Sequence, residues 1–161
     1  MAIDNRHDIK LLNGLYSALL DNAQAYGEAV EATPDAGHTQ FYRARDAERR
    51  TLAAGLATEI EARGGEPTHG EGLLAKAQKV VKDVKHALGR DDAATLSAFE
   101  QHETTLLGRF DRALEDADMS ATTRETIRRT RVEVARGHDD LEGLKHSTQD
   151  PTDPRPDLTP Q

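Results

Sequence analysis

Four side chains in this 161-residue sequence have the chemistry to bind a metal ion inside a helical protein: Asp21, Glu48, Glu103 and His138. Carboxylates and imidazoles are common protein ligands of transition metals such as iron and manganese. Glu103 is the most informative of the four, because the residues around it form a regular pattern. A buried carboxylate needs a cation, a proton or a hydrogen-bond donor, so its surroundings decide which chemistry is open to it.

Glu103 lies in the middle of a largely apolar series whose members recur at alternating steps of three and four residues: Leu96, Phe99, Glu103, Leu106, Phe110, Ala113 and Ala117. This spacing predicts a helix over about residues 92–117 that packs lengthwise on other helices. The central question for the protein is therefore which group Glu103 faces.

The same periodicity predicts two long helices before this one. The first covers about residues 5–33 and ends at Pro34, because the residue before a proline avoids helical geometry. The second covers about residues 35–63 and ends at Gly64-Gly65, since glycine is the usual residue after a helix. Its middle is charged, and a spacing of 41, 45, 48 and 52 predicts that Arg45 and Glu48 turn inward.

A fourth long helix is expected over residues 121–146, after Ser120, a residue type that caps helix N-termini. Short turns at 33–35 and 117–120 predict two antiparallel hairpins, and residues 64–91 must join them. Because that connection is long and contains a predicted shorter helix over 73–88, we expect an all-α, ferritin-like four-helix bundle with a long crossover. The bundle would comprise residues 1–146.

The remaining residues, 147–161, alternate proline with aspartate and threonine, which predicts a disordered tail. Overall, 29 acidic residues against 21 basic ones give a formal charge of -8, which disfavours nucleic-acid binding. The sequence has no cysteine, which excludes disulfides and thiolate metal sites. No apolar run approaches the length of a membrane span or a signal-peptide core, so a cytoplasmic location without membrane contact is expected.

Several fragments go beyond generic helical patterns: Glu48-Arg49-x-x-Leu52-Ala53-x-x-Leu56 running into Arg63-Gly64-Gly65, Lys85-x-x-Leu88-Gly89-x-Asp91-Asp92, Glu103 followed by Phe110 and Ala113-Leu114, and Ala135-x-x-His138-Asp139. Together they resemble a bacterial four-helix-bundle family, the domain of unknown function 2383, which is grouped with the ferritin-like superfamily. The resemblance covers about Leu11 to Lys145. It implies a fold and a distant kinship, and the family has no established activity.

A ferritin-like di-metal centre needs carboxylates from all four helices and a Glu-x-x-His motif on two of them. The predicted helices lack this motif: Glu48 is followed three residues later by Thr51, and Glu133 by Arg136. Counting from the turns places Glu103 at the level of residue 133, close to Arg131. A guanidinium at that level would compete with a divalent cation for the carboxylate oxygens.

We therefore predict a buried polar network in which Glu103 pairs with Arg131 or Arg45, with these members: Arg45, Glu48, Glu103, Arg131 and His138. No metal or other cofactor is expected. The alternative is a divergent metal-binding or di-iron oxidase-type bundle that holds iron or manganese with the following residues: Asp21, Glu48, Glu103 and His138.

The predicted function is that of a non-catalytic structural or protein-interaction module in a stress-related setting, a setting that the resemblance alone suggests. Self-association is expected, with a dimer as the first guess, because long bundles offer broad Ala- and Leu-bearing faces. A third hypothesis is that a lysine face on the predicted shorter helix docks an acidic partner, with these residues: Lys76, Lys79, Lys82 and Lys85.

Overall fold

The computed structural model describes residues 5–33, 36–69 and 92–149, and these residues form four α-helices without any strand. The helices are α1 (Arg6–Ala32), α2 (Ala36–Ala62), α4 (Asp92–Leu114) and α5 (Ala121–Gln149). For this part of the chain, the prediction of an all-α protein with four long helices is confirmed. The predicted shorter helix with its lysine face lies outside the described residues. Of the predicted disordered tail, 147–161, residues 147–149 instead belong to α5, and the rest lies outside the described residues.

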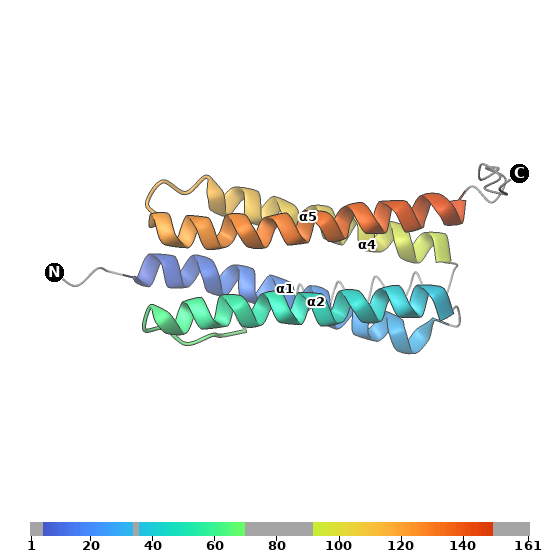
Figure 1. Cartoon of the computed structure of the whole chain (residues 1–161), viewed down its shortest axis with the longest axis horizontal. Coiled ribbons are helices and arrows are strands. Elements are labelled where there is room, and N and C mark those ends of the chain that lie inside the picture. The colour runs from blue at the N-terminus through green and yellow to red at the C-terminus, as the bar shows by residue number, and fades with distance from the viewer. Residues whose placement is uncertain (1–4, 34–35, 70–91, 150–161) are drawn as a thin grey trace, which may run out of the picture.

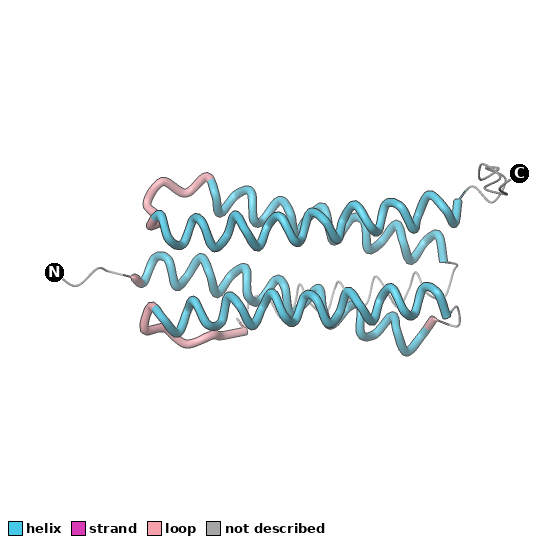
Figure 2. Tube along the Cα trace, viewed as in Figure 1, coloured by secondary structure: helices cyan, strands magenta, loops and turns pink. Residues whose placement is uncertain are grey.

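The four helices lie lengthwise beside one another, with α1 next to α2 and α4 next to α5 (Figure 1). Contacts between α4 and α5 join Asp111 to Arg131 and Glu100 to Lys145, so these two helices run in opposite directions. The loop from α4 to α5 and the segment after α2 lie at the same end of the molecule as the start of α1 (Figure 2).

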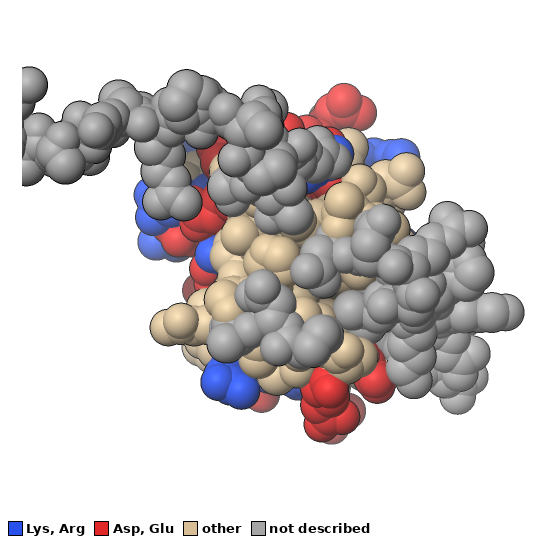
Figure 3. Space-filling view, turned by 90° about the vertical axis from the view of Figure 1, so that its right-hand side faces the viewer, with Lys and Arg blue, Asp and Glu red and all other residues tan. Residues whose placement is uncertain are grey.

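The core consists of two apolar clusters. One lies toward the end that holds the α4–α5 loop and contains Leu12, Leu56 and Phe110, among others. The second is aromatic and includes Tyr26, Tyr42 and Phe99. In the visible part of the end at which α1 and α5 finish, uncharged residues lie toward the middle and charged side chains lie toward the margins (Figure 3).

The periodic series around Glu103 is buried from Leu96 to Ala113, as its spacing predicts. The series ends earlier than expected, because α4 stops at Leu114 and Ala117 is exposed in the loop that follows. The described helices include none that is long and apolar enough to cross a membrane.

The start of α5 is tied to α1 by a buried carboxylate. Ser120 caps α5, since its hydroxyl oxygen accepts a hydrogen bond from the backbone N–H of Thr123 at 3.3 Å. Asp8 accepts hydrogen bonds from the N–H of Ser120 at 3.3 Å and from the hydroxyl of Thr123 at 2.9 Å. Its negative charge therefore lies at the positive end of the α5 dipole. Burial disfavours the Asp8 carboxylate, but these hydrogen bonds and the charge of Arg63 hold its pKa below the usual value.

We expect Asp8→Asn to lower the free energy of unfolding by about 1–2 kcal/mol at neutral pH, because it removes a buried carboxylate from a helix N-terminus. The pKa of Asp8 is lower in the folded state than in the unfolded state. The contribution of Asp8 to the free energy of unfolding is therefore complete above the pKa of the unfolded state, and it is lost as the pH falls through the pKa of the folded state. Urea unfolding from pH 7 to pH 3 measures this effect. The difference between wild type and variant should shrink below about pH 4. The matched control is Asp111→Asn, whose carboxylate is half exposed, and a constant difference across the pH range would refute the role of Asp8.

Candidate functional site

The middle of the bundle contains an ion pair that is sealed from solvent. Glu103 on α4 and Arg49 on α2 both have completely buried side chains. Arg49 Nη2 donates a hydrogen bond to Glu103 Oε2 at 2.8 Å, and Arg49 Nε donates to Asn22 Oδ1 at 3.0 Å. The second carboxylate oxygen, Glu103 Oε1, accepts from the Tyr26 hydroxyl at 2.7 Å. Glu103 thus faces a guanidinium and a phenol.

The aromatic cluster forms one wall of this site. The Tyr26 ring stacks on Phe99 with centroids 4.2 Å apart and planes 2° apart, and Tyr42 lies 5.1 Å from the same Phe99 ring. Burial raises the pKa of Tyr26 well above its usual value, and the neighbouring Glu103 charge adds to this. The phenol therefore keeps its proton and donates to the carboxylate.

Arg45 forms an outer layer beside the buried pair. Its guanidinium bonds to Glu48 and, at 3.2 Å, to Asp140 on α5, and it lies over the Phe41 ring at 5.3 Å. Gly137 of α5 makes room for both arginines: a Cβ at this position would lie 2.6 Å from Arg45 Nη1 and 2.6 Å from Arg49 Nη2. Glycine is thus the residue that allows the two guanidiniums to approach the α5 backbone.

Glu103 pairs with Arg49 and with neither of its two predicted partners. Arg45 is buried, as predicted, but it pairs with Glu48 and Asp140. The inward face of α2 contains Arg49, whereas Glu48 is only partly buried. The buried positions of this helix are His38, Tyr42, Arg45, Arg49, Ala53, Leu56 and Ile60. Those positions also follow steps of three and four, a signal in the sequence that identifies the correct face. Arg131, the other expected partner, lies at the surface and pairs with Asp111, because α5 turns Ile127 and Val134 inward instead.

Asp21 takes part in a different arrangement that the sequence analysis missed. Asn13, Ser17 and Asp21 lie one turn apart along α1, and together they bind the extended segment after α2. The Asn13 side chain donates to the carbonyl of Glu66 at 3.2 Å and accepts from the N–H of Thr68 at 2.8 Å. Ser17 donates to the carbonyl of Thr68 at 3.0 Å, and Asp21 bonds to the imidazole of His69.

The chain does contain one Glu-x-x-His sequence, Glu66 to His69, but it lies in this extended segment and not on a helix. Burial raises the pKa of Asp21, and the opposing effects of His69 and Arg109 are smaller. A cavity of about 60 Å³ beside Asp21 and Asn22 has room for a few water molecules.

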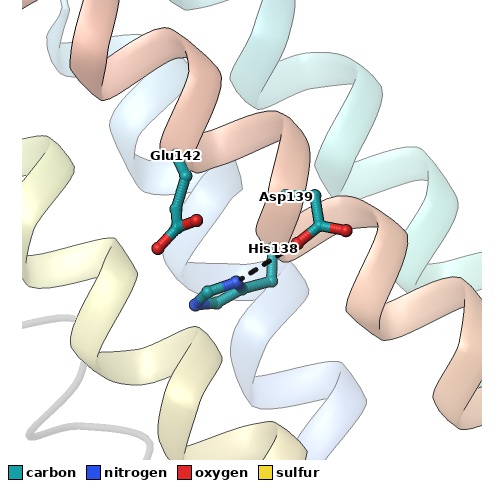
Figure 4. Close-up of side chains that lie close together, drawn as sticks. All are labelled: His138, Asp139 and Glu142. Carbon is teal, nitrogen blue, oxygen red and sulfur yellow. Dashed lines mark ion pairs between the residues drawn. The ribbon is translucent and has the colours of Figure 1, made fainter.

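His138 lies on α5 next to two acidic side chains of the same helix (Figure 4). Its Nδ1 is 3.9 Å from the Asp139 carboxylate, and ligand atoms of His138, Asp139 and Glu142 all lie within 4.8 Å of one another. Among the described residues, this is the group of three or more such side chains that could hold an ion. Asp139 and Glu142 are exposed, and the group belongs to one helix, so it is not a bridging centre inside the bundle.

The four residues considered as metal ligands are thus engaged separately. Asp21 bonds to His69, Glu48 to Arg45, Glu103 to Arg49 and Tyr26, and His138 lies near Asp139. These side chains do not fit a di-metal centre at Glu103, because Arg49 already supplies the positive charge and both carboxylate oxygens accept hydrogen bonds.

A family model described as a domain of unknown function (DUF2383) matches residues 8–116. The chain therefore belongs to this family. The match ends before α5, so it confirms the resemblance over α1, α2 and α4 and not over the part that reaches Lys145. Neither the curated proteins nor the solved structures contain a match to the chain.

We expect Arg49→Met to lower the free energy of unfolding by about 3–5 kcal/mol, because it leaves the Glu103 charge buried without its cation. Glu103→Gln should cost about 1–3 kcal/mol, since the guanidinium then lacks a charged acceptor. Chemical denaturation of each variant measures both values. In the double variant Arg49→Met with Glu103→Leu, the loss should be smaller than the sum of the losses measured for Arg49→Met alone and Glu103→Leu alone.

The matched control is Arg131→Met, which removes an arginine whose ion pair is partly solvated and should cost less than about 1 kcal/mol. A greater loss for Arg131→Met than for Arg49→Met would contradict the assignment of Arg49 as the partner of Glu103.

Proposed function

We propose that this protein is a non-catalytic helical bundle that acts as a structural or protein-interaction module. The observation that carries the proposal is the buried pair of Arg49 and Glu103. A carboxylate that accepts from a guanidinium and a phenol has no free oxygen for a metal ion or a proton relay. The adjacent cavity of about 60 Å³ is far smaller than typical small-molecule sites of about 300–1,000 Å³.

The proposal includes a ferritin-like arrangement, with two antiparallel hairpins joined by a crossover. The course of the chain after α2 supports it. Residues 66–69 follow α1 from Asn13 to Asp21, away from the end at which α2 finishes. The next described helix, α4, begins at the far end of the bundle (Figure 1). A bacterial and stress-related setting follows the family resemblance and is part of the same proposal. A cytoplasmic location, expected from the sequence pattern, is part of it too.

We further propose that the module forms a homodimer through the face shared by α2 and α5. Val132 on this face is a large apolar residue with 49% of its surface exposed. It borders a groove of about 460 Å³ that is also lined by Leu52 and Gly55 of α2. Arg129 and Glu133 lie on either side of Val132, one turn apart. If two copies pair α5 antiparallel about a two-fold axis near residue 131, Arg129 of each copy lies opposite Glu133 of the other.

This dimer is tested by sedimentation velocity of the full chain and of charge variants. We expect Arg129→Glu and Glu133→Arg each to produce monomers, because each places like charges opposite one another at two positions. The combined exchange of Arg129→Glu with Glu133→Arg should restore the dimer. A monomeric wild-type chain, or variants that all sediment like the wild type, would refute this interface while leaving the interior assignment intact.

The metal-binding alternative is tested by elemental analysis after incubation with Fe²⁺, Mn²⁺ or Zn²⁺ and desalting. We expect protein that retains no iron or manganese and that oxidises Fe²⁺ no faster than buffer, because Arg49 neutralises Glu103. Retention of about two iron or manganese ions per chain would instead favour the oxidase-type bundle. If the protein retains zinc and the variant His138→Ala does not, the zinc is bound by the exposed group on α5 and not inside the bundle.

A further inference from the structure

A groove of about 500 Å³ opens between α1 and α4, near the loop that joins α4 to α5. Its inner wall is apolar: Leu15 and Ala113 are buried core residues, and Leu11 is partly buried beside them. The volume lies within the range of about 300–1,000 Å³ that is usual for small-molecule sites. This groove is thus eight times larger than the cavity beside Asp21, at about 500 against about 60 Å³.

Three cationic side chains line the same groove: Lys10 from α1, and Arg109 and Arg112 from α4. In the part of the chain that the structure describes, none of the three has a carboxylate within ion-pair distance, whereas most of the other described arginines do. The acidic side chain at the groove, Asp116, is bonded to His7 at 2.9 Å. The groove is therefore locally positive in a chain whose formal charge is -8.

Three cations that form no ion pair with a described carboxylate, beside an apolar wall, complement a ligand that has an anionic head and an apolar body. We propose that this groove binds a small amphiphilic anion, a free carboxylic acid with an aliphatic chain. Its carboxylate lies among Lys10, Arg109 and Arg112, and its chain covers Leu11, Leu15 and Ala113. An anionic membrane surface is a poorer occupant, because the net negative charge of the protein opposes binding to it.

Gly14 keeps the groove open and provides the sharpest test. It lines the groove on the exposed side of α1, and a Cβ at this position would meet no atom within 4 Å. A leucine here would extend into the space that the aliphatic chain occupies. Because leucine favours helical structure more than glycine does, this substitution should block the site without destabilising α1.

The experiment is isothermal titration of the full-length protein with sodium dodecanoate, kept below its micelle concentration. We expect one site per chain, with binding weakened about tenfold by Arg112→Gln and at least that much by Gly14→Leu. Dodecyltrimethylammonium, which has the same aliphatic chain and a cationic head, should not bind. The matched control is Gly143→Leu on α5, also at an exposed glycine with open space around it, and it should bind like the wild type.

Thermal unfolding of each variant shows whether it is folded. If Gly14→Leu does not fold, the double variant Lys10→Gln with Arg109→Gln tests the same site by removing two of its charges.

Equal binding of dodecanoate and dodecyltrimethylammonium, or unchanged dodecanoate binding by the variants, would overturn the proposal in favour of non-specific apolar adsorption. Binding to phosphatidylglycerol vesicles without binding of monomeric dodecanoate would overturn it in favour of a membrane surface. The metal and dimer experiments are unaffected by any of these outcomes, because they involve other side chains.

Discussion

One buried ion pair, Arg49 with Glu103, brings all four described helices together in a single layer. The arginine comes from α2 and the glutamate from α4, while α1 supplies Asn22 and Tyr26. The α5 helix contributes the closely approached backbone at Gly137. Each charge needs the other, since an isolated ion in an apolar interior costs several kcal/mol. Moving any helix by one turn would separate these groups, so the layer restricts how the helices can be aligned.

The same layer divides the apolar core into two parts and determines what chemistry the interior can support. On one side of the layer lies the apolar cluster that contains Leu12, Leu56 and Phe110, and on the other side lies the aromatic cluster. Within the layer, both carboxylate oxygens of Glu103 accept hydrogen bonds, so they are not available as ligands for a metal ion. The groups that remain available lie outside the core, in the groove between α1 and α4 and on the face of α2 and α5. A scaffold whose interior serves stability and whose surfaces serve binding is consistent with both proposals.

Polar residues on α1 show how much of the arrangement depends on contacts distant in sequence. Asn13, Ser17 and Asp21 recur every four residues, and nothing in that spacing indicates their partner, a segment that is more than 45 residues away. Asp8 likewise resembles an ordinary first-turn acid, although its oxygens accept hydrogen bonds at the start of α5. No local spacing reveals such partners, because hydrogen bonds between segments depend on how the helices are placed in space.

The amino-acid sequence alone determined that the described part of the chain is all-α, where its long helices lie and that Glu103 is buried. Apolar residues recur with the helical repeat, helices bury their apolar stripe, and proline, glycine and serine indicate the helix ends. The tertiary structure decided the partner of Glu103. On α2, two adjacent series both have helical spacing, one through Glu48 and the other through Arg49, and they differ by only about 100° around the helix axis. Which of them faces inward depends on the space that Gly137 leaves on α5 and on the acceptors that Asn22 and Glu103 offer. These are properties of the assembled bundle, which no single helix contains.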